Sequence, residues 1–168
     1  MNKYLKFIIL FFLLSTLAFA KWELKEVIDE FQEGTGVTRL LNKPVNIEPP
    51  DFAEIAIQKN ITKDKEEYMG ALITNQTVAF EVLNKIEITR LKVKTEKSNI
   101  YEIIGIIDVS YDYILISFLL NDELIESMKK SKTLKIIYNT SHTTTQYLEF
   151  NIKNTEKFLK KLKPSIFN

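Results

Sequence analysis

The only histidine of the chain, His142, lies in a hydroxyl-rich segment between Thr140 and Thr145. A histidine titrates near neutral pH, so it can shuttle a proton, ligate a metal or activate a neighbouring nucleophile such as Ser141. A zinc site needs three or four histidine, cysteine or carboxylate ligands, and this chain has one histidine and no cysteine. A nucleophile–histidine pair also needs an acid behind the imidazole, and adjacency in sequence does not provide one. We therefore interpret His142 as a solvated turn residue.

Carboxylates occur in adjacent pairs, which raises the question of acid–base catalysis. Glycoside hydrolysis uses two carboxyl groups about 5 to 9.5 Å apart across a cleft, whereas neighbours on one turn or strand do not face a common space. The acidic segment 29–33 offers oxygen ligands for calcium, but it lacks the spacing of an EF-hand loop. We interpret these residues as surface charge and helix capping, and we predict no metal, no cofactor and no enzymatic activity. The pairs are Asp29/Glu30, Glu66/Glu67 and Asp122/Glu123.

The first twenty residues have the pattern of a secretory signal peptide. Lys3 and Lys6 supply a positive start, residues 7–14 form an apolar run, and Ala18-Phe19-Ala20 fits a small-x-small cleavage site. The apolar run is shorter than the roughly 20 residues that span a bilayer, although an uncleaved membrane anchor is the alternative. Because Ala18 and Ala20 are small, we predict cleavage after Ala20. A composition rich in Lys, Ile and Asn suggests an AT-rich bacterial genome, so we predict a periplasmic or secreted protein.

Cleavage leaves 168 − 20 = 148 residues, which fits one mainly β domain over residues 21–168. A chain of this length can fold without a disulfide or a metal, and it contains no cysteine. The mature chain has 23 − 2 = 21 basic and 22 acidic residues, a net charge of −1. It lacks the basic field that binds nucleic acid or anionic membranes. We predict no nucleic acid partner, no stable membrane insertion after signal cleavage, and another envelope or secreted protein as partner.

Short apolar segments separated by turn residues are typical of strands. Residues 86–94 and 100–109 form the clearest hairpin, and the β-branched run 100–109 is expected to be buried on both faces. A connecting helix is predicted from a cap at Asn121 or Asp122 to about Lys130, and a second helix is predicted to end at Pro164. The sequence therefore predicts an antiparallel β-sandwich or open barrel with one connecting helix and a C-terminal helix.

Several single positions carry expectations of their own. The lone tryptophan, Trp22, is expected in the core of the first strand. Residues 59–67 are polar and predict a turn, and Gly70 is expected to mark a bulge in the next strand. The connector with Pro44, Pro49 and Pro50 predicts an extended loop or a sheet edge, because proline lacks the amide hydrogen that a central strand donates.

Three parts of the chain together carry a resemblance. The opening runs from Lys21-Trp22-Glu23-Leu24-Lys25 through Asp29-Glu30-Phe31 to Gly34-Thr35-Gly36, and the ending comprises Leu124 to Lys135, Tyr147 to Phe150 and Phe158-Leu159. Between them, residues 86–107 show a charged-alternating strand, a polar turn and an apolar strand with Gly105. This arrangement resembles small exported bacterial proteins of uncharacterised function. More distantly, it is similar to periplasmic accessory proteins of type VI secretion and to the invasion-associated locus B group. The resemblance implies a β-sandwich-like exported domain and no catalytic residue.

Our first hypothesis is an exported binding module of the cell envelope without catalytic activity. A sheet edge near the connector 43–50 would accept a partner strand, and the tip of the hairpin 140–145 would add polar contacts. The alternative is an inhibitor or accessory factor whose protruding loop enters the cleft of an envelope enzyme. A third possibility is a hydrolase with scattered carboxylates. The candidate partner-binding residues are Thr140, Ser141, His142, Thr143, Pro44 and Pro49.

Overall fold

The computed structural model describes residues 22–28, 34–47, 51–62, 65–110, 112–141 and 144–166. Within these ranges the strands are β1 (Glu23–Ile28), β2 (Gly34–Asn42), β3 (Ala53–Ile61), β4 (Glu66–Thr74), β5 (Glu81–Leu83), β6 (Ile86–Thr95), β7 (Tyr101–Val109), β8 (Ile114–Leu120), β9 (Thr133–Asn139), β10 (Thr145–Asn151) and β11 (Ser165–Ile166). The helices are α2 (Asp122–Lys130) and α3 (Thr155–Leu159).

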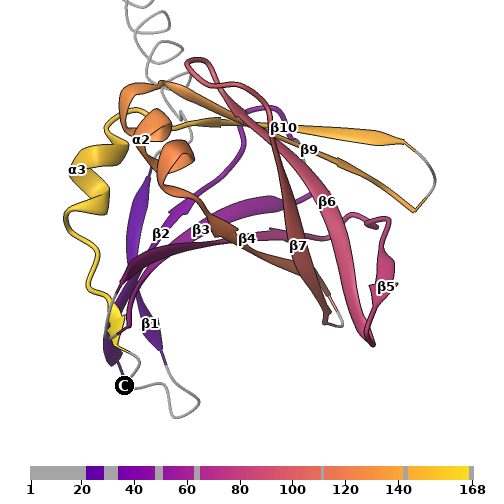
Figure 1. Cartoon of the computed structure of the whole chain (residues 1–168), viewed down its shortest axis with the longest axis horizontal. Coiled ribbons are helices and arrows are strands. Elements are labelled where there is room, and N and C mark those ends of the chain that lie inside the picture. Colours follow the sequence, from indigo (N-terminus) through magenta and orange to yellow (C-terminus); the bar gives the residue numbers. More distant parts are fainter. Residues whose placement is uncertain are drawn as a thin grey trace, which may run out of the picture.

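All eleven of these strands belong to one sheet. Its main path runs β1-β2-β3-β4-β8-β7-β6-β9-β10, with β5 beside β6 and β11 beside β3. The main path is antiparallel throughout, and β11 runs parallel to β3. The sheet curls into a half-barrel, with both helices against one side of it (Figure 1). The prediction of a mainly β protein is therefore confirmed, and an open barrel describes it better than a sandwich.

The segment that follows β2 meets β10, the other end of the sheet path. Pro44 forms an isolated antiparallel bridge with Phe150. The side-chain amide of Asn46 donates to the carbonyl of Tyr147 at 2.6 Å, and its oxygen accepts from the amide of Glu149 at 2.9 Å. Asn46 therefore supplies the donor and the acceptor that a neighbouring strand would otherwise supply. These contacts join the two sides of the half-barrel at one corner.

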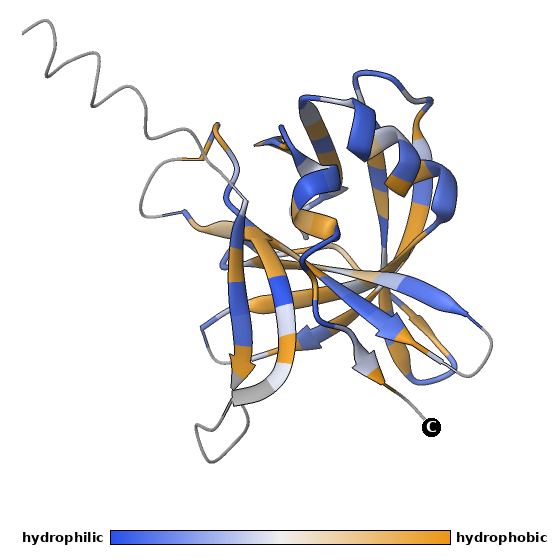
Figure 2. Ribbon diagram, turned by 90° about the vertical axis from the view of Figure 1, so that its left-hand side faces the viewer, coloured by the Kyte–Doolittle hydropathy of each residue, from blue (hydrophilic) through white to orange (hydrophobic). Residues whose placement is uncertain are grey.

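The core lies on the inner face of the curled sheet. The strands carry hydrophobic and hydrophilic residues in alternation, as the banding along the ribbons shows (Figure 2). From α2, the side chains of Leu124, Ile125 and Met128 are buried among the inner residues of the strands. Leu159 of α3 belongs to the same cluster. The helices thus cover apolar surface that the half-barrel alone would leave in water.

Helix α2 forms where the sequence predicts it. Asn121 is its N-cap, and its side-chain oxygen accepts a 2.8 Å hydrogen bond from the amide of Leu124. Acidic residues occupy the first turn and Lys129 and Lys130 occupy the last, which complements the helix dipole. The prediction that Asp122 and Glu123 serve the start of a helix is confirmed.

The C-terminal segment bonds to two strands at the end of the sheet where β2 and β3 no longer pair. Thr38 donates its amide to the carbonyl of Lys163, and the Lys163 amide donates to the hydroxyl of Thr38 at 2.7 Å. On the other side, Ser165 lies opposite Asn60 in the parallel pairing of β11 with β3. The segment 163–166 is therefore bound to the sheet on both sides.

Three local expectations need correction. Segment 59–67 is not one turn, because β3 continues to Ile61 and β4 starts at Glu66. Gly70 does not mark a bulge: its pairing with both neighbouring strands is regular, and a Cβ there would lie 2.3 Å from the Phe118 ring. Strand β7 is not buried on both faces, because alternate residues of it point to the outside of the half-barrel.

Candidate binding surface

The outer face of β4, β8 and β7 carries apolar side chains in register. Met69 of β4 lies opposite Leu119 of β8, with exposed fractions of 40% and 53%. Ile104 and Ile106 project from the same face of β7 and are about half exposed, at 54% and 51%. Isolated exposed apolar residues are ordinary in soluble proteins, but exposed apolar residues that recur on one face of neighbouring strands make that face a candidate interaction surface.

Small side chains form a row across the middle of this face. Ala56 of β3 pairs with Ala71 of β4, Ala71 pairs with Ser117 of β8, and Ser117 pairs with Ile106 of β7. Larger residues flank the row on both sides, with Met69/Leu119 on one side and Ile73/Leu115 on the other. Because paired residues share a face of the sheet, the result is a depression that runs across the strands. We call this depression, lined by Ala56, Ala71, Ser117, Met69, Ile73 and Leu115, the trough.

The trough contains a hollow of about 230 Å³. Arg39 of β2 lines one end of it and is the one charged side chain among the described lining residues. Its Nε donates to the side-chain oxygen of Gln58 at 2.8 Å, and Gln58 in turn donates to Asn60 at 2.9 Å. The opposite end leads to Ile106 and β6. The trough therefore has a cationic, polar end and an apolar end.

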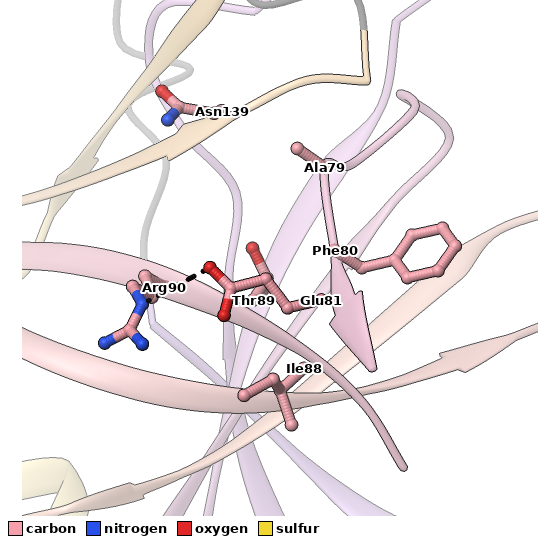
Figure 3. Close-up of a pocket in the computed structure, with 7 residues that line it drawn as sticks. All are labelled: Ala79, Phe80, Glu81, Ile88, Thr89, Arg90 and Asn139. Atoms are coloured by element: carbon pink, nitrogen blue, oxygen red, sulfur yellow. Dashed lines mark ion pairs between the residues drawn. The ribbon is translucent and has the colours of Figure 1, made fainter. Parts of the chain in front are cut away.

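A second hollow of about 130 Å³ lies between β5, β6 and the end of β9. Arg90 and Glu81 form an ion pair across it, with 3.6 Å between Nε and Oε1, and the Phe80 ring points away from that pair (Figure 3). Ile88 and Asn139 also line this hollow. Since both its charges are already paired with each other, this hollow offers little to a charged ligand.

The predicted hairpin tip is described only in part. Thr140 donates its amide to the carbonyl of Thr144, and the hydroxyls of the same two residues share a further hydrogen bond. Ser141 is exposed. His142 and Thr143 lie outside the described residues, and so does Pro49. The role of the hairpin tip in binding stays a prediction.

Pro44 does lie in an extended sheet-edge segment, as its residue type predicts. That edge is occupied within the chain, because Pro44 bridges Phe150 and the amide of Val45 donates to the carbonyl of Glu149 at 2.7 Å. A partner strand would have to displace β10 to pair there. For this reason, the outer face offers a more accessible surface than the connector.

Eight of the described carboxylates form ion pairs with lysine or arginine. Glu123 and Glu126 line one further hollow of about 370 Å³ together with Lys97 and Lys130, and Glu126 is paired with Lys129. The hydrogen bond from Lys59, 2.7 Å from Nζ to Oε1, holds the pKa of Glu66 below its ordinary value. Hydrogen bonds from Lys129 and Lys160 likewise lower the pKa values of Glu126 and Glu156. Carboxyls with a lowered pKa are poor general acids near neutral pH. Asp29 and Glu30 lie outside the described residues.

Burial, followed by a hydrogen bond to Glu66, raises the pKa of Tyr68 to about 12. In the part of the chain that the structure describes, no three His, Cys, Asp or Glu side chains gather closely enough to hold a metal ion. No helix in that same part is long and apolar enough to span a membrane.

Comparison with known proteins gives a likeness of fold. No protein-family model matches the sequence, and no curated protein sequence matches it. Among solved structures, invasion associated protein B from Bartonella henselae is similar to this chain, with a TM-score of 0.58 and 13% sequence identity. The match covers 86% of this chain and 91% of that one. At this level of identity the likeness is one of fold.

Sequence reasoning missed the trough. Its small residues come from β3, β4 and β8, so their alignment depends on pairing between segments far apart in the chain. One local signal was available: Ala56 lies between Ile55 and Ile57, and Ser117 interrupts the apolar run 114–120. A small residue in such a run can indicate close approach of another group.

Proposed function

We propose that this protein is an exported binding module of the cell envelope that acts without catalysis. The signal-peptide pattern of residues 1–20 supports export. The observation that carries the binding proposal is the exposed apolar face formed by Met69, Leu119, Ile104 and Ile106. Exposed residues of this kind favour association with another protein over action on a small polar substrate.

The pairing of described carboxylates with cations supports a non-catalytic role. Glu66, Glu126 and Glu156 each form an ion pair with a lysine. A hydrolase would instead need a pair of carboxyls with different proton affinities facing one cleft.

A second candidate is an inhibitor or accessory factor that inserts a loop into an envelope enzyme. The β9–β10 hairpin favours it, because the hairpin extends beyond the rest of the sheet (Figure 1). The contacts between Thr140 and Thr144 would give the base of such a loop a defined shape.

Crosslinking in the native cell, followed by mass spectrometry, tests the proposed function. We expect one reproducible envelope or secreted protein to be captured. In parallel, the purified mature protein is offered glycan, peptide and ester substrates. Turnover of any of them, with no reproducible partner, would overturn the proposal and return attention to the carboxylates.

A further inference from the structure

We propose that the trough binds an extended apolar segment of a partner protein, with a carboxylate of that segment at Arg39. This inference rests on the proposed function and specifies the chemistry of the partner. It goes beyond the exposed apolar face, because it assigns a direction and a charge to the bound segment.

The guanidinium of Arg39 is held in place by a hydrogen bond to a neighbouring strand. The Nε of Arg39 donates to Gln58, which fixes the plane of the guanidinium. The two terminal nitrogens carry four further hydrogens that can donate to a ligand. Among the described residues, no carboxylate forms an ion pair with Arg39. Arg90, by contrast, is paired with Glu81. A guanidinium held in this way is suited to receive a carboxylate through two parallel hydrogen bonds.

The bottom of the trough is formed by small residues. Ala56, Ala71 and Ser117 present at most two heavy atoms each beyond Cα, so a bound chain can approach the sheet closely. From β3 to β7 there are three strand spacings, which amount to about 14 Å, or roughly four residues of extended chain. The walls on either side are apolar. A short extended segment therefore fits the length and the width of the trough.

A second copy of the chain, a free small molecule and a segment of a partner protein are the candidate occupants of the trough. In a two-fold dimer the same patch meets itself, so two troughs would face each other and leave both hollows unfilled. A free small molecule is normally buried over most of its surface, whereas this trough lies on an open sheet face. A segment that protrudes from a partner protein fills the hollow and also covers Ile104 and Leu119 beside it. Charge complementarity with Arg39 places an acidic residue at the β2 end of that segment.

Selection from a phage-displayed library of short random peptides tests this inference. The mature protein alone is the target of selection, and the enriched peptides are then measured against an Ala71→Trp variant, which fills the trough. We expect the enriched peptides to share apolar residues and one Asp or Glu. A synthetic copy of an enriched peptide should bind Arg39→Gln at least about ten-fold more weakly than wild type, because the variant loses a hydrogen bond between two charged groups. Arg90→Gln is the matched control and should bind like wild type.

Three outcomes would overturn the inference. Enriched peptides without an acidic residue, or equal binding to Arg39→Gln, would contradict the assigned carboxylate. Unchanged binding to Ala71→Trp would move the site away from the trough. Concentration-dependent dimerisation that is lost in Ala71→Trp would identify a second copy as the occupant. Circular dichroism checks the fold of Ala71→Trp, and Ser117→Tyr replaces it if that variant does not fold. None of these results bears on partner capture in the cell, which tests the proposed function separately.

Discussion

The indole Nε1 of Trp22 donates a 2.9 Å hydrogen bond to the hydroxyl oxygen of Thr155, which lies 133 residues later in the chain. Both residues are buried, with Trp22 only 3% exposed, so the prediction of a core tryptophan is confirmed. The Thr155 hydroxyl in turn donates to the carbonyl of Ile152. This relay joins Trp22, which directly precedes β1, to α3, and these two parts of the chain are therefore expected to unfold together.

We predict that Thr155→Val destabilises the protein by about 1–3 kcal/mol. Valine has nearly the same shape, but it leaves the buried indole N–H of Trp22 without its acceptor and removes one of the two hydrogen bonds that the Ile152 carbonyl accepts from Thr155. Urea unfolding followed by tryptophan fluorescence measures the change. Thr77→Val is the matched control, because Thr77 is exposed, and it should change stability by less than about 0.5 kcal/mol. Equal stabilities for the two variants would contradict the relay.

Gly70→Ala is predicted to cost about 1–3 kcal/mol of stability. The added methyl group would lie 2.3 Å from Cε2 of the Phe118 ring, and a ring packed in a core cannot bend away. In a double-mutant cycle with Phe118→Leu, which removes the ring edge, the cost of Gly70→Ala should become smaller. Strictly additive costs, measured by urea unfolding, would show that the two residues do not compete for space.

Ile106 and Ile107 are adjacent, but replacement by threonine should reduce the stability of the protein much less at Ile106 than at Ile107. Ile106 is 51% exposed on the outer face, so Ile106→Thr is expected to change stability by less than about 0.5 kcal/mol. Ile107 is 8% exposed, and Ile107→Thr buries a hydroxyl and loses apolar contact, which we expect to cost at least about 1 kcal/mol. Thermal unfolding of the two variants checks the assignment of faces. A larger loss for Ile106→Thr would reverse it.

The raised pKa of Tyr68 predicts that the folded protein loses stability at alkaline pH. Its folded pKa is about 12, above the ordinary value of 10, because burial and the hydrogen bond to Glu66 favour the neutral phenol. The unfolded chain therefore loses the proton first, so the stabilisation is complete below pH 10 and disappears as the pH rises to 12. Tyr68→Phe should flatten the fall in stability over this range, measured by urea unfolding at several pH values. An identical fall in the variant would assign it to other groups.

The sequence predicted the features that depend on local pattern. Asn121 identifies the start of α2 through its side chain, and residues 86–94 and 100–109 do pair as β6 and β7. The exposed face of β7 could not be predicted in this way. Its run of isoleucine and valine lacks the polar–apolar alternation that distinguishes an outward residue from an inward one. The run is therefore a typical pattern for a strand buried on both faces, whereas its outward residues belong to the candidate binding surface.

Contacts between segments that lie far apart in the chain could not be predicted from local sequence pattern either. The bridge between Pro44 and Phe150 depends on the curl of the whole sheet, and the parallel pairing of β11 depends on where β2 leaves β3. Proline at 44 does indicate a sheet edge, but it does not indicate that β10 lies along that edge. Arg39 lies opposite Gln58, whereas Leu41 lies opposite Ala56, so Arg39 lines the hollow diagonally from the neighbouring pair, an arrangement that depends likewise on the register of distant strands.

The most direct test of the central claim is a scan with a photo-crosslinking residue across the outer face in the native cell. The residue replaces Ile104 and Leu119 on the proposed surface, and Lys157 on the exposed side of α3 as a control. We predict that Ile104 and Leu119 yield one and the same crosslinked partner and that Lys157 yields none. Crosslinks from Lys157 to that partner, with none from Ile104 or Leu119, would contradict the claim that the outer face of β4, β8 and β7 is the binding surface.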